Sequence, residues 1–266
     1  MSYNIEALQL KVAQLSRKTH ELGIPVMILF EGVPASGKTR LSNELLLNLD
    51  AKYTDFIATK SPESNDLRYQ FLQKYWNTLS QKGNINIYFR SWYSHYLDYK
   101  ENQIKQNQYS NYDVLVRQID DFENMLKKDN YEIIKFFIEI NEEKRQEHIE
   151  QTKENPLMKW KVQEYGKVIP RDIYISEMRQ IINDSDDWKV IDYTERKQAV
   201  ENMYAHIIER LESAIDNFQT HESVIDGNFN KNFSTSLFDI EVPKIHKKEY
   251  KAVSYTHLTL PTNREV

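Results

Sequence analysis

Short apolar runs alternate with longer segments in which apolar residues recur at helical spacing. The runs that predict β-strands are Val26–Phe30, Thr54–Thr59, Ile85–Phe89, Glu132–Ile140 and Trp188–Asp192. The segments that predict helices are Leu41–Leu49, Asn65–Leu79, Tyr112–Leu126, Glu142–Thr152, Ile173–Ile182 and Arg196–Ile215. Because strands alternate with helices, we predict an α/β fold in which a parallel five-stranded sheet lies between two helical layers, α/β/α.

A glycine-rich loop directly follows the first predicted strand. Residues 32–39 read GVPASGKT and fit the phosphate-binding P-loop pattern G-x-x-x-x-G-K-[ST]. In such a loop, backbone N–H groups and a helix N-terminus surround a phosphate, the lysine reaches it, and the last hydroxyl contacts Mg²⁺. The strand–loop–helix context disfavours an ordinary turn. The predicted phosphate-binding residues here are Gly32, Ser36, Gly37, Lys38 and Thr39, with Thr39 also the predicted Mg²⁺ contact.

The composition narrows the class of protein. The chain has 266 residues, a net charge of −5 and no cysteine. Disulfides and thiolate metal sites are therefore excluded, and the acidic balance argues against general binding to nucleic acid. The seven histidines show no ligand spacing, and no apolar run is long enough for a membrane span. We expect a cytoplasmic protein that does not bind membranes.

A second candidate element follows the predicted strand Ile85–Phe89 and reads Arg90-Ser91-Trp92-Tyr93. Carboxyl ends of parallel strands meet at one edge, so Arg90 should lie near the glycine-rich loop. A guanidinium there could clamp a transferring phosphoryl group with bidentate geometry. The alternative is an ordinary ion pair for Arg90. For Trp92 and Tyr93 the pattern favours a place in the core.

Several motifs together resemble the polyphosphate kinase type 2 family, which transfers phosphoryl groups between inorganic polyphosphate and nucleotides. The glycine-rich loop and Arg90–Tyr93 match two of its signatures, in order and spacing. Further matches are Leu72–Trp76 followed by Leu79–Gly83, Phe122–Leu126, Lys135–Phe137 and Asn155–Lys161. The resemblance extends from about Ile24 to Trp188. It implies a P-loop kinase-like fold with a helical lid at about residues 142–170.

The resemblance also implies roles for single residues. Lys38 would contact the phosphates and Arg90 would bind polyphosphate or the transferring group, so these are the candidate catalytic residues. Lys74 stands where the family has a helix arginine, and Lys159 and Lys161 would bring positive charge from the lid to the nucleotide. The implied ligands are inorganic polyphosphate, AMP or another nucleotide, and Mg²⁺. A homo-oligomer is compatible with the family.

The chain departs from the family pattern at the acidic positions. The family's loop aspartate is replaced by Pro34, and the aspartate before the R-S-W-Y arginine is replaced by Phe89. By resemblance these carboxylates organise Mg²⁺ and the acceptor phosphate, and neither replacement can bind a metal. A lid arginine corresponds to His148. The P-loop domain could therefore bind phosphates and yet be catalytically degenerate.

The C-terminal part follows a different pattern. We expect a P-loop domain over residues 1–217, followed over 218–251 by a linker and the start of a truncated second unit. Residues 252–262 resemble a translated transposon-end sequencing adapter, so 252–266 are excluded from reasoning about the fold. Polyphosphate:AMP phosphotransferases of this family include tandem proteins, and the chain resembles the N-terminal half of one. A second homologous domain is therefore expected in the intact protein.

Three functions are compatible with these patterns. The first is phosphoryl transfer from polyphosphate to a nucleotide such as AMP. The second is a non-catalytic half that binds polyphosphate or supports a partner domain, as the absence of both carboxylates suggests. The third is an ATP-dependent nucleotide kinase, which the Gly37-Lys38-Thr39 ending fits but the Arg90–Tyr93 element does not explain.

Overall fold

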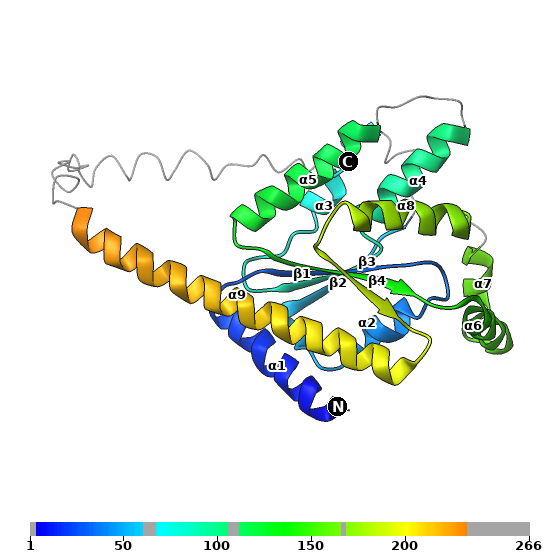
Figure 1. Cartoon of the computed structure of the whole chain (residues 1–266), viewed down its shortest axis with the longest axis horizontal. Helices are drawn as coiled ribbons and strands as arrows, with labels where there is room; N and C mark the ends of the chain where they lie inside the picture. Colours follow the sequence, from blue (N-terminus) through cyan, green and yellow to red (C-terminus); the bar gives the residue numbers. More distant parts are fainter. Residues whose placement is uncertain (1–3, 61–67, 106–111, 166–168, 233–266) are drawn as a thin grey trace, which may run out of the picture. The chain divides into compact units, whose positions relative to one another are not determined.

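A parallel sheet forms the centre of the computed structural model, which describes residues 4–60, 68–105, 112–165 and 169–232 (Figure 1). The strands are β1 (Val26–Glu31), β2 (Thr54–Ala58), β3 (Ile85–Phe89), β4 (Glu132–Glu139) and β5 (Trp188–Asp192). All neighbouring pairs are parallel, in the order β2-β3-β1-β4-β5. The predicted α/β fold is therefore confirmed.

Helices cover both faces of this sheet. They are α1 (Ile5–Glu21), α2 (Lys38–Leu46), α3 (Gln73–Trp76), α4 (Trp92–Lys105), α5 (Tyr112–Lys128), α6 (Glu142–Glu154), α7 (Trp160–Tyr165), α8 (Arg171–Asn183) and α9 (Arg196–Asn232), with a 3-10 helix at Ala51–Tyr53. In Figure 1, α1, α2 and α9 lie on one side of the sheet, and α3, α4, α5 and α8 lie on the other.

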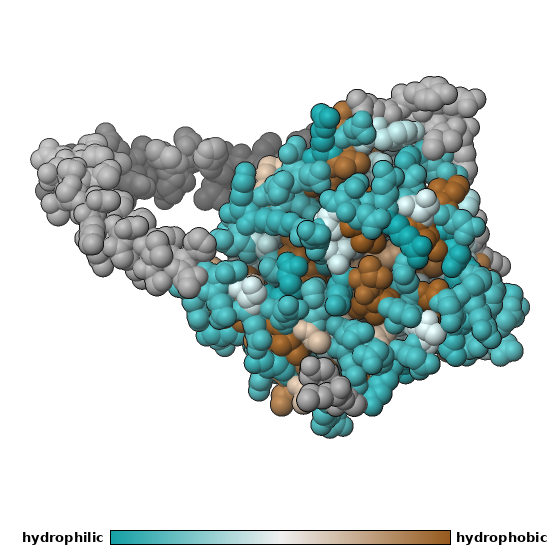
Figure 2. Space-filling model, in the orientation of Figure 1, coloured by the Kyte–Doolittle hydropathy of each residue, from teal (hydrophilic) through white to brown (hydrophobic). Residues whose placement is uncertain are grey.

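The alternation of side chains along β1 divides the core in two. Ile28 and Phe30 pack with residues of α1, α2 and α9, whereas Met27 and Leu29 pack with residues of α3, α4, α5 and α8. Both faces of a sheet covered by helices require strands that are apolar on both sides, and β1 is buried along its whole length. The outer surface seen in Figure 2 is mostly hydrophilic, with apolar residues in patches.

Several helices differ from the sequence-based prediction, and α1 was not among the predicted segments. In the described part, the helix predicted over Asn65–Leu79 is the short helix α3. Side chains bond the backbone where it ends: the Thr78 hydroxyl donates to the Tyr75 carbonyl at 3.0 Å, and the Asn86 amide donates to the Thr78 carbonyl at 2.7 Å. Helix α4 was not predicted. Helix α9 continues past Ile215 to Asn232, beyond the point where its apolar stripe ends and a polar linker was expected.

The chain divides into two compact units, residues 1–220 and 221–266. In the second unit only the helical backbone up to Asn232 is described. The expected start of a second domain and the adapter-like segment 252–266 lie outside the described residues, apart from that helix. In the described ranges, no helix combines the length and the apolar character needed to cross a membrane.

Candidate functional site

The glycine-rich loop leads from β1 into α2 with the backbone that the motif predicts. Gly37 precedes α2 with φ at 101°, and Gly32 has φ at 142°. A Cβ on Gly37 would lie 2.4 Å from the Tyr193 ring, and one on Gly32 would lie 2.5 Å from the Ile138 carbonyl oxygen. Both positions therefore require glycine, for conformation and for space.

We expect Gly37→Ala to destabilise the fold more than Gly23→Ala. Both glycines have positive φ, which costs an alanine about 1–2 kcal/mol, but nothing lies within 4 Å of a Cβ at Gly23. Overpacking against Tyr193 adds about 1–3 kcal/mol. Urea unfolding of both variants measures the difference, and equal losses of stability would show that Tyr193 moves aside freely.

A cavity of about 600 Å³ opens beside the loop. Predicted site residues that line it are Ser36, Gly37, Lys38, Thr39, Arg90 and Lys161, together with Pro34 and Phe89. Gly32, Lys74 and Lys159 are not among the lining residues. The Lys74 amine lies over the Tyr75 ring, 5.4 Å from its centre, and the Lys159 amide bonds the Asn155 carbonyl at 2.9 Å. The structure thus brings the loop, Arg90 and one lid lysine together.

Lys38 is buried at the floor of this cavity and turns back onto its own loop. Its amine donates to the carbonyl oxygens of Gly32 and Val33 and lies 5.6 Å from the centre of the Phe89 ring. Burial lowers the pKa of Lys38 to about 7; the negative charge of Glu31 raises it in part, and Arg90 lowers it. A phosphate bound in the loop would add a negative charge beside this amine.

This pKa predicts that phosphate binding weakens with rising pH. Below pH 7 the amine of Lys38 is protonated and attracts an anion, whereas above pH 7 a proton must be taken up on binding. Affinity for polyphosphate should fall about tenfold per pH unit just above pH 7, measured by calorimetry. Lys38→Arg keeps its positive charge over this pH range, so its affinity for polyphosphate should not change with pH. If the affinity of both proteins falls in parallel, the pH dependence belongs to the ligand.

Arg90 lies at the carboxyl end of β3 in a left-handed conformation, with φ at 65°. Such a backbone is uncommon outside glycine and recurs at functional sites. Its guanidinium bonds the Asp98 carboxylate at 2.6 Å, and the Thr59 hydroxyl donates to its carbonyl at 2.6 Å. Arg90 therefore reaches the cavity from a fixed backbone and carries a counter-ion from α4.

The acidic groups near the loop are not those of the family pattern. The Pro34 carbonyl accepts from Arg145, and the Phe89 ring packs against Phe56. The nearby carboxylates are Glu31 and Asp98, which hydrogen bonds and an ion pair already engage. Within the described ranges, no group of three or more His, Asp or Glu side chains could hold a metal ion. The donor set does not form a metal site of its own.

Helix α6, in the predicted lid, rests on the glycine-rich loop. It begins at Glu142 because the Asn141 side chain accepts from the Lys144 amide. His148 contacts the Ala35 carbonyl through Nδ1 at 3.1 Å and Arg40 through Nε2 at 3.0 Å. This pairing requires the proton on Nδ1, and burial lowers the pKa of the ring, which favours the neutral form. Met158, Trp160 and Tyr165 complete the cavity wall.

Trp92 and Tyr93 belong to the core, as the sequence favoured. Trp92 Nε1 and the Tyr93 hydroxyl each donate to Glu123 Oε1 at 2.9 Å. The other oxygen of Glu123 pairs with Lys135 at 2.6 Å, and all these side chains are buried. Sequence reasoning missed this ion pair, because Lys135 sits within an apolar strand and Glu123 on an otherwise amphipathic helix.

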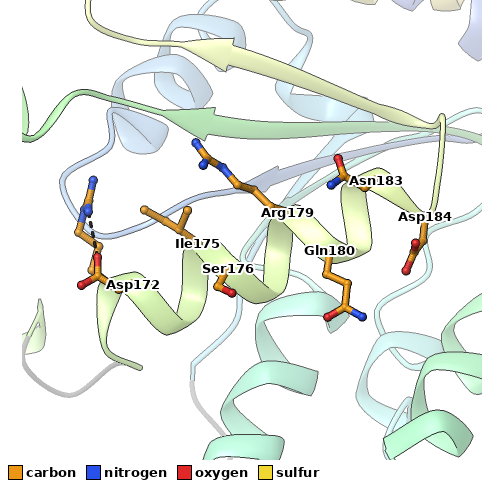
Figure 3. Close-up of a pocket in the computed structure, with 8 residues that line it drawn as sticks. Asp172, Ile175, Ser176, Arg179, Gln180, Asn183 and Asp184 are labelled. Atoms are coloured by element: carbon orange, nitrogen blue, oxygen red, sulfur yellow. Dashed lines mark hydrogen bonds and ion pairs between the residues drawn. The ribbon is translucent and has the colours of Figure 1, made fainter.

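Another hollow, of about 740 Å³, lies along α8 (Figure 3). All of its lining residues come from this helix and its C-terminal cap, and none is a predicted site residue. Arg179 extends toward the strands and pairs with Glu139 on β4 at 3.0 Å. A depression formed by one helix lacks converging groups, so we place the candidate site at the glycine-rich loop.

The chain is similar in sequence to several phosphotransferases. It is 23% identical to NDP-polyphosphate phosphotransferase 3 of Ruegeria pomeroyi over 73% of this chain and 66% of the relative. It is 22% identical to polyphosphate:AMP phosphotransferase of Pseudomonas aeruginosa, over 80% of this chain and 45% of the relative. The chain thus spans less than two thirds of the length of either protein.

Solved structures share the fold. Polyphosphate kinase 2 from Arthrobacter aurescens matches with a TM-score of 0.66 at 15% identity, over 81% of this chain and 78% of that one. A putative polyphosphate kinase 2 from Pseudomonas aeruginosa matches with a TM-score of 0.62 at 19% identity, over 80% and 46%. The family model of polyphosphate kinase 2 covers residues 2–219. The resemblance seen in the motifs is thereby confirmed, and the chain belongs to the polyphosphate kinase 2 family.

Proposed function

We propose that this chain binds inorganic polyphosphate and serves phosphoryl transfer between it and a nucleotide such as AMP. The observation that carries the proposal is that Lys38, Arg90 and the N-terminus of α2 face one cavity. Relatives named polyphosphate:AMP and NDP-polyphosphate phosphotransferases support the substrate class. We also propose that the protein acts in the cytoplasm, where nucleotides are available.

In this reaction the chain's own residues position and neutralise charge. Loop N–H groups from Gly32 to Thr39 and the amine of Lys38 would hold the end phosphates, and Arg90 would bind the transferring group. A nucleotide phosphate oxygen forms the new P–O bond as the bond to the polyphosphate chain breaks. Trp160 and Lys161 would cover the nucleotide from the lid, with Lys74 and Lys159 adding positive charge farther out.

Mg²⁺ would reach this site with its substrates. Such cations take part of their ligands from substrate phosphates, and the Thr39 hydroxyl in the cavity is the group of the loop that could join them. With Pro34 and Phe89 at the acidic positions, we propose a catalytically weak half of a tandem enzyme. Matches covering 45% and 46% of two longer relatives support the presence of a second homologous domain.

The non-catalytic role is the second candidate, favoured by the absence of an acidic cluster among the described residues. A donor screen separates the candidates: the purified chain is mixed with AMP and either polyphosphate or ATP, and ADP formed from AMP and binding of each donor are measured. Polyphosphate binding with ADP formation supports the enzyme, and binding alone supports the second role. Transfer from ATP alone would identify a conventional kinase, and absence of polyphosphate binding would refute the proposal.

A further inference from the structure

Glu31 carries a fully buried carboxylate directly before the glycine-rich loop. A buried carboxylate is costly unless several donors surround it. Its Oε1 accepts from the Ser91 amide at 2.6 Å, the Ser91 hydroxyl at 2.8 Å and the Ser94 amide at 3.4 Å. Its Oε2 accepts from the Ser94 hydroxyl at 2.5 Å and the Tyr174 hydroxyl at 2.7 Å. All five donors come from α8 or the start of α4.

The carboxylate of Glu31 acts as a cap for α4, although it lies 60 residues before Ser91 in the chain. Backbone N–H groups at a helix start lack partners and favour a negative charge. Arg90 directly precedes this capped turn, and its amide bonds the Phe30 carbonyl of β1 at 3.2 Å. The strand that leads into the loop therefore also fixes the backbone from which Arg90 extends.

Tyr174 joins the loop to the same carboxylate. Its hydroxyl donates to Glu31 and accepts from the backbone N–H of Gly32, the first residue of the loop, at 3.2 Å. Burial raises the pKa of the Tyr174 hydroxyl well above its usual range, so the donated proton stays in place. Helix α8 follows the predicted lid directly, so this one hydroxyl connects the element after the lid with the loop.

We propose that Tyr174 and Glu31 are positioning residues of the phosphate site, which hold the first residue of the loop and the start of α4 in one arrangement. Lys38 and Arg90 then face the same anion in the cavity that both line. The inference rests on the proposed function in one respect, that this anion is polyphosphate. Neither residue lines the cavity, so both act through the groups that they hold.

The test compares Tyr174→Phe with a matched variant, Tyr204→Phe. Tyr204 is also buried and also makes two hydrogen bonds, donating to the Glu44 carbonyl at 2.9 Å and accepting from Asn48 at 2.8 Å. It lies on the other face of the sheet. Because the chain has six glycines, ¹⁵N-glycine labelling resolves the Gly32 amide signal, and polyphosphate affinity is measured on the same samples.

For Tyr174→Phe we expect a shifted Gly32 amide signal and at least a fivefold weaker affinity for polyphosphate. Tyr204→Phe, at a comparable fall in melting temperature, should leave the Gly32 signal in place and the affinity within twofold. Ser94→Ala removes one donor to Glu31 from the α4 side and should change the signal and the affinity in the same direction as Tyr174→Phe. If Tyr174→Phe does not fold, Ser94→Ala provides the test.

Two failures are distinguishable in this design. A wild-type chain that binds no polyphosphate refutes the proposed function, and the Gly32 signal then still reports whether Tyr174 holds the loop. A wild-type chain that binds, together with Tyr174→Phe and Ser94→Ala that bind equally well, overturns the positioning roles. An unchanged Gly32 signal in Tyr174→Phe also overturns them.

Discussion

Replacing Lys38 by methionine should lower polyphosphate affinity and any phosphoryl transfer by about 10²–10³-fold. Methionine keeps an unbranched chain of similar length, so it still fills the buried space beside Phe89. What is lost is a positive charge in a cavity where the surrounding protein screens charges poorly. The measurements are polyphosphate binding by calorimetry and ADP formation from AMP.

Lys11→Met is the matched control. Its amine pairs with Glu212 at 2.8 Å on the surface and is about half exposed, so the substitution removes the same charge away from the cavity. Surface ion pairs contribute little to stability. We expect wild-type binding from this variant. Should both methionine variants bind equally, net charge rather than the loop lysine would account for the affinity.

Restoring the two family carboxylates, Pro34→Asp with Phe89→Asp, should raise polyphosphate-dependent transfer about 10²-fold. Both positions line the cavity with Lys38 and Arg90, so two new carboxylates would face the bound phosphates. The Pro34 carbonyl, which accepts from Arg145, is retained by aspartate. ADP formation from AMP and polyphosphate is the readout.

The control for this gain is the double variant Pro34→Asn with Phe89→Asn. Asparagine has the size of aspartate and the same loss of aromatic packing against Phe56, but it carries no negative charge. Only the aspartate pair should gain activity. If the aspartate pair folds and stays as inactive as the asparagine pair, the missing carboxylates do not explain the weakness that we propose.

The sheet could be predicted because its signal is local. The central strands, such as Val26–Phe30, are short apolar runs buried on both faces, and the structure places all five strands within one residue of their predicted ends. The helices α2, α5 and α8 carry regular apolar stripes that sequence reading detects. Fold class and family therefore followed from pattern and motif.

Helix α4 escaped prediction because polar side chains are buried among the apolar ones, which include Trp92 and Tyr93. Ser94, His95 and Asp98 are buried beside Tyr96 and Leu97, so hydrophobic spacing gives no period there. The carboxylates Glu31 and Asp98 were missed for a related reason. Glu31 lies far in sequence from Ser91 and Tyr174, which it binds, and Asp98 pairs with Arg90 from within the helix that was not predicted. A charged residue ending an apolar strand, as Glu31 does, was the available signal.

The burial of Trp92 and Tyr93 against Glu123 and Lys135 has a consequence for how relatives of this protein are recognised. These aromatic rings hold a charged pair inside the core, and loss of one member would leave a buried charge uncompensated, at about 3–5 kcal/mol. The requirements of folding alone would then preserve Trp92 and Tyr93, even in a relative that has lost activity. A genome search that uses these two aromatic residues therefore detects common descent, and we propose positions 34 and 89 as the residues to inspect for activity.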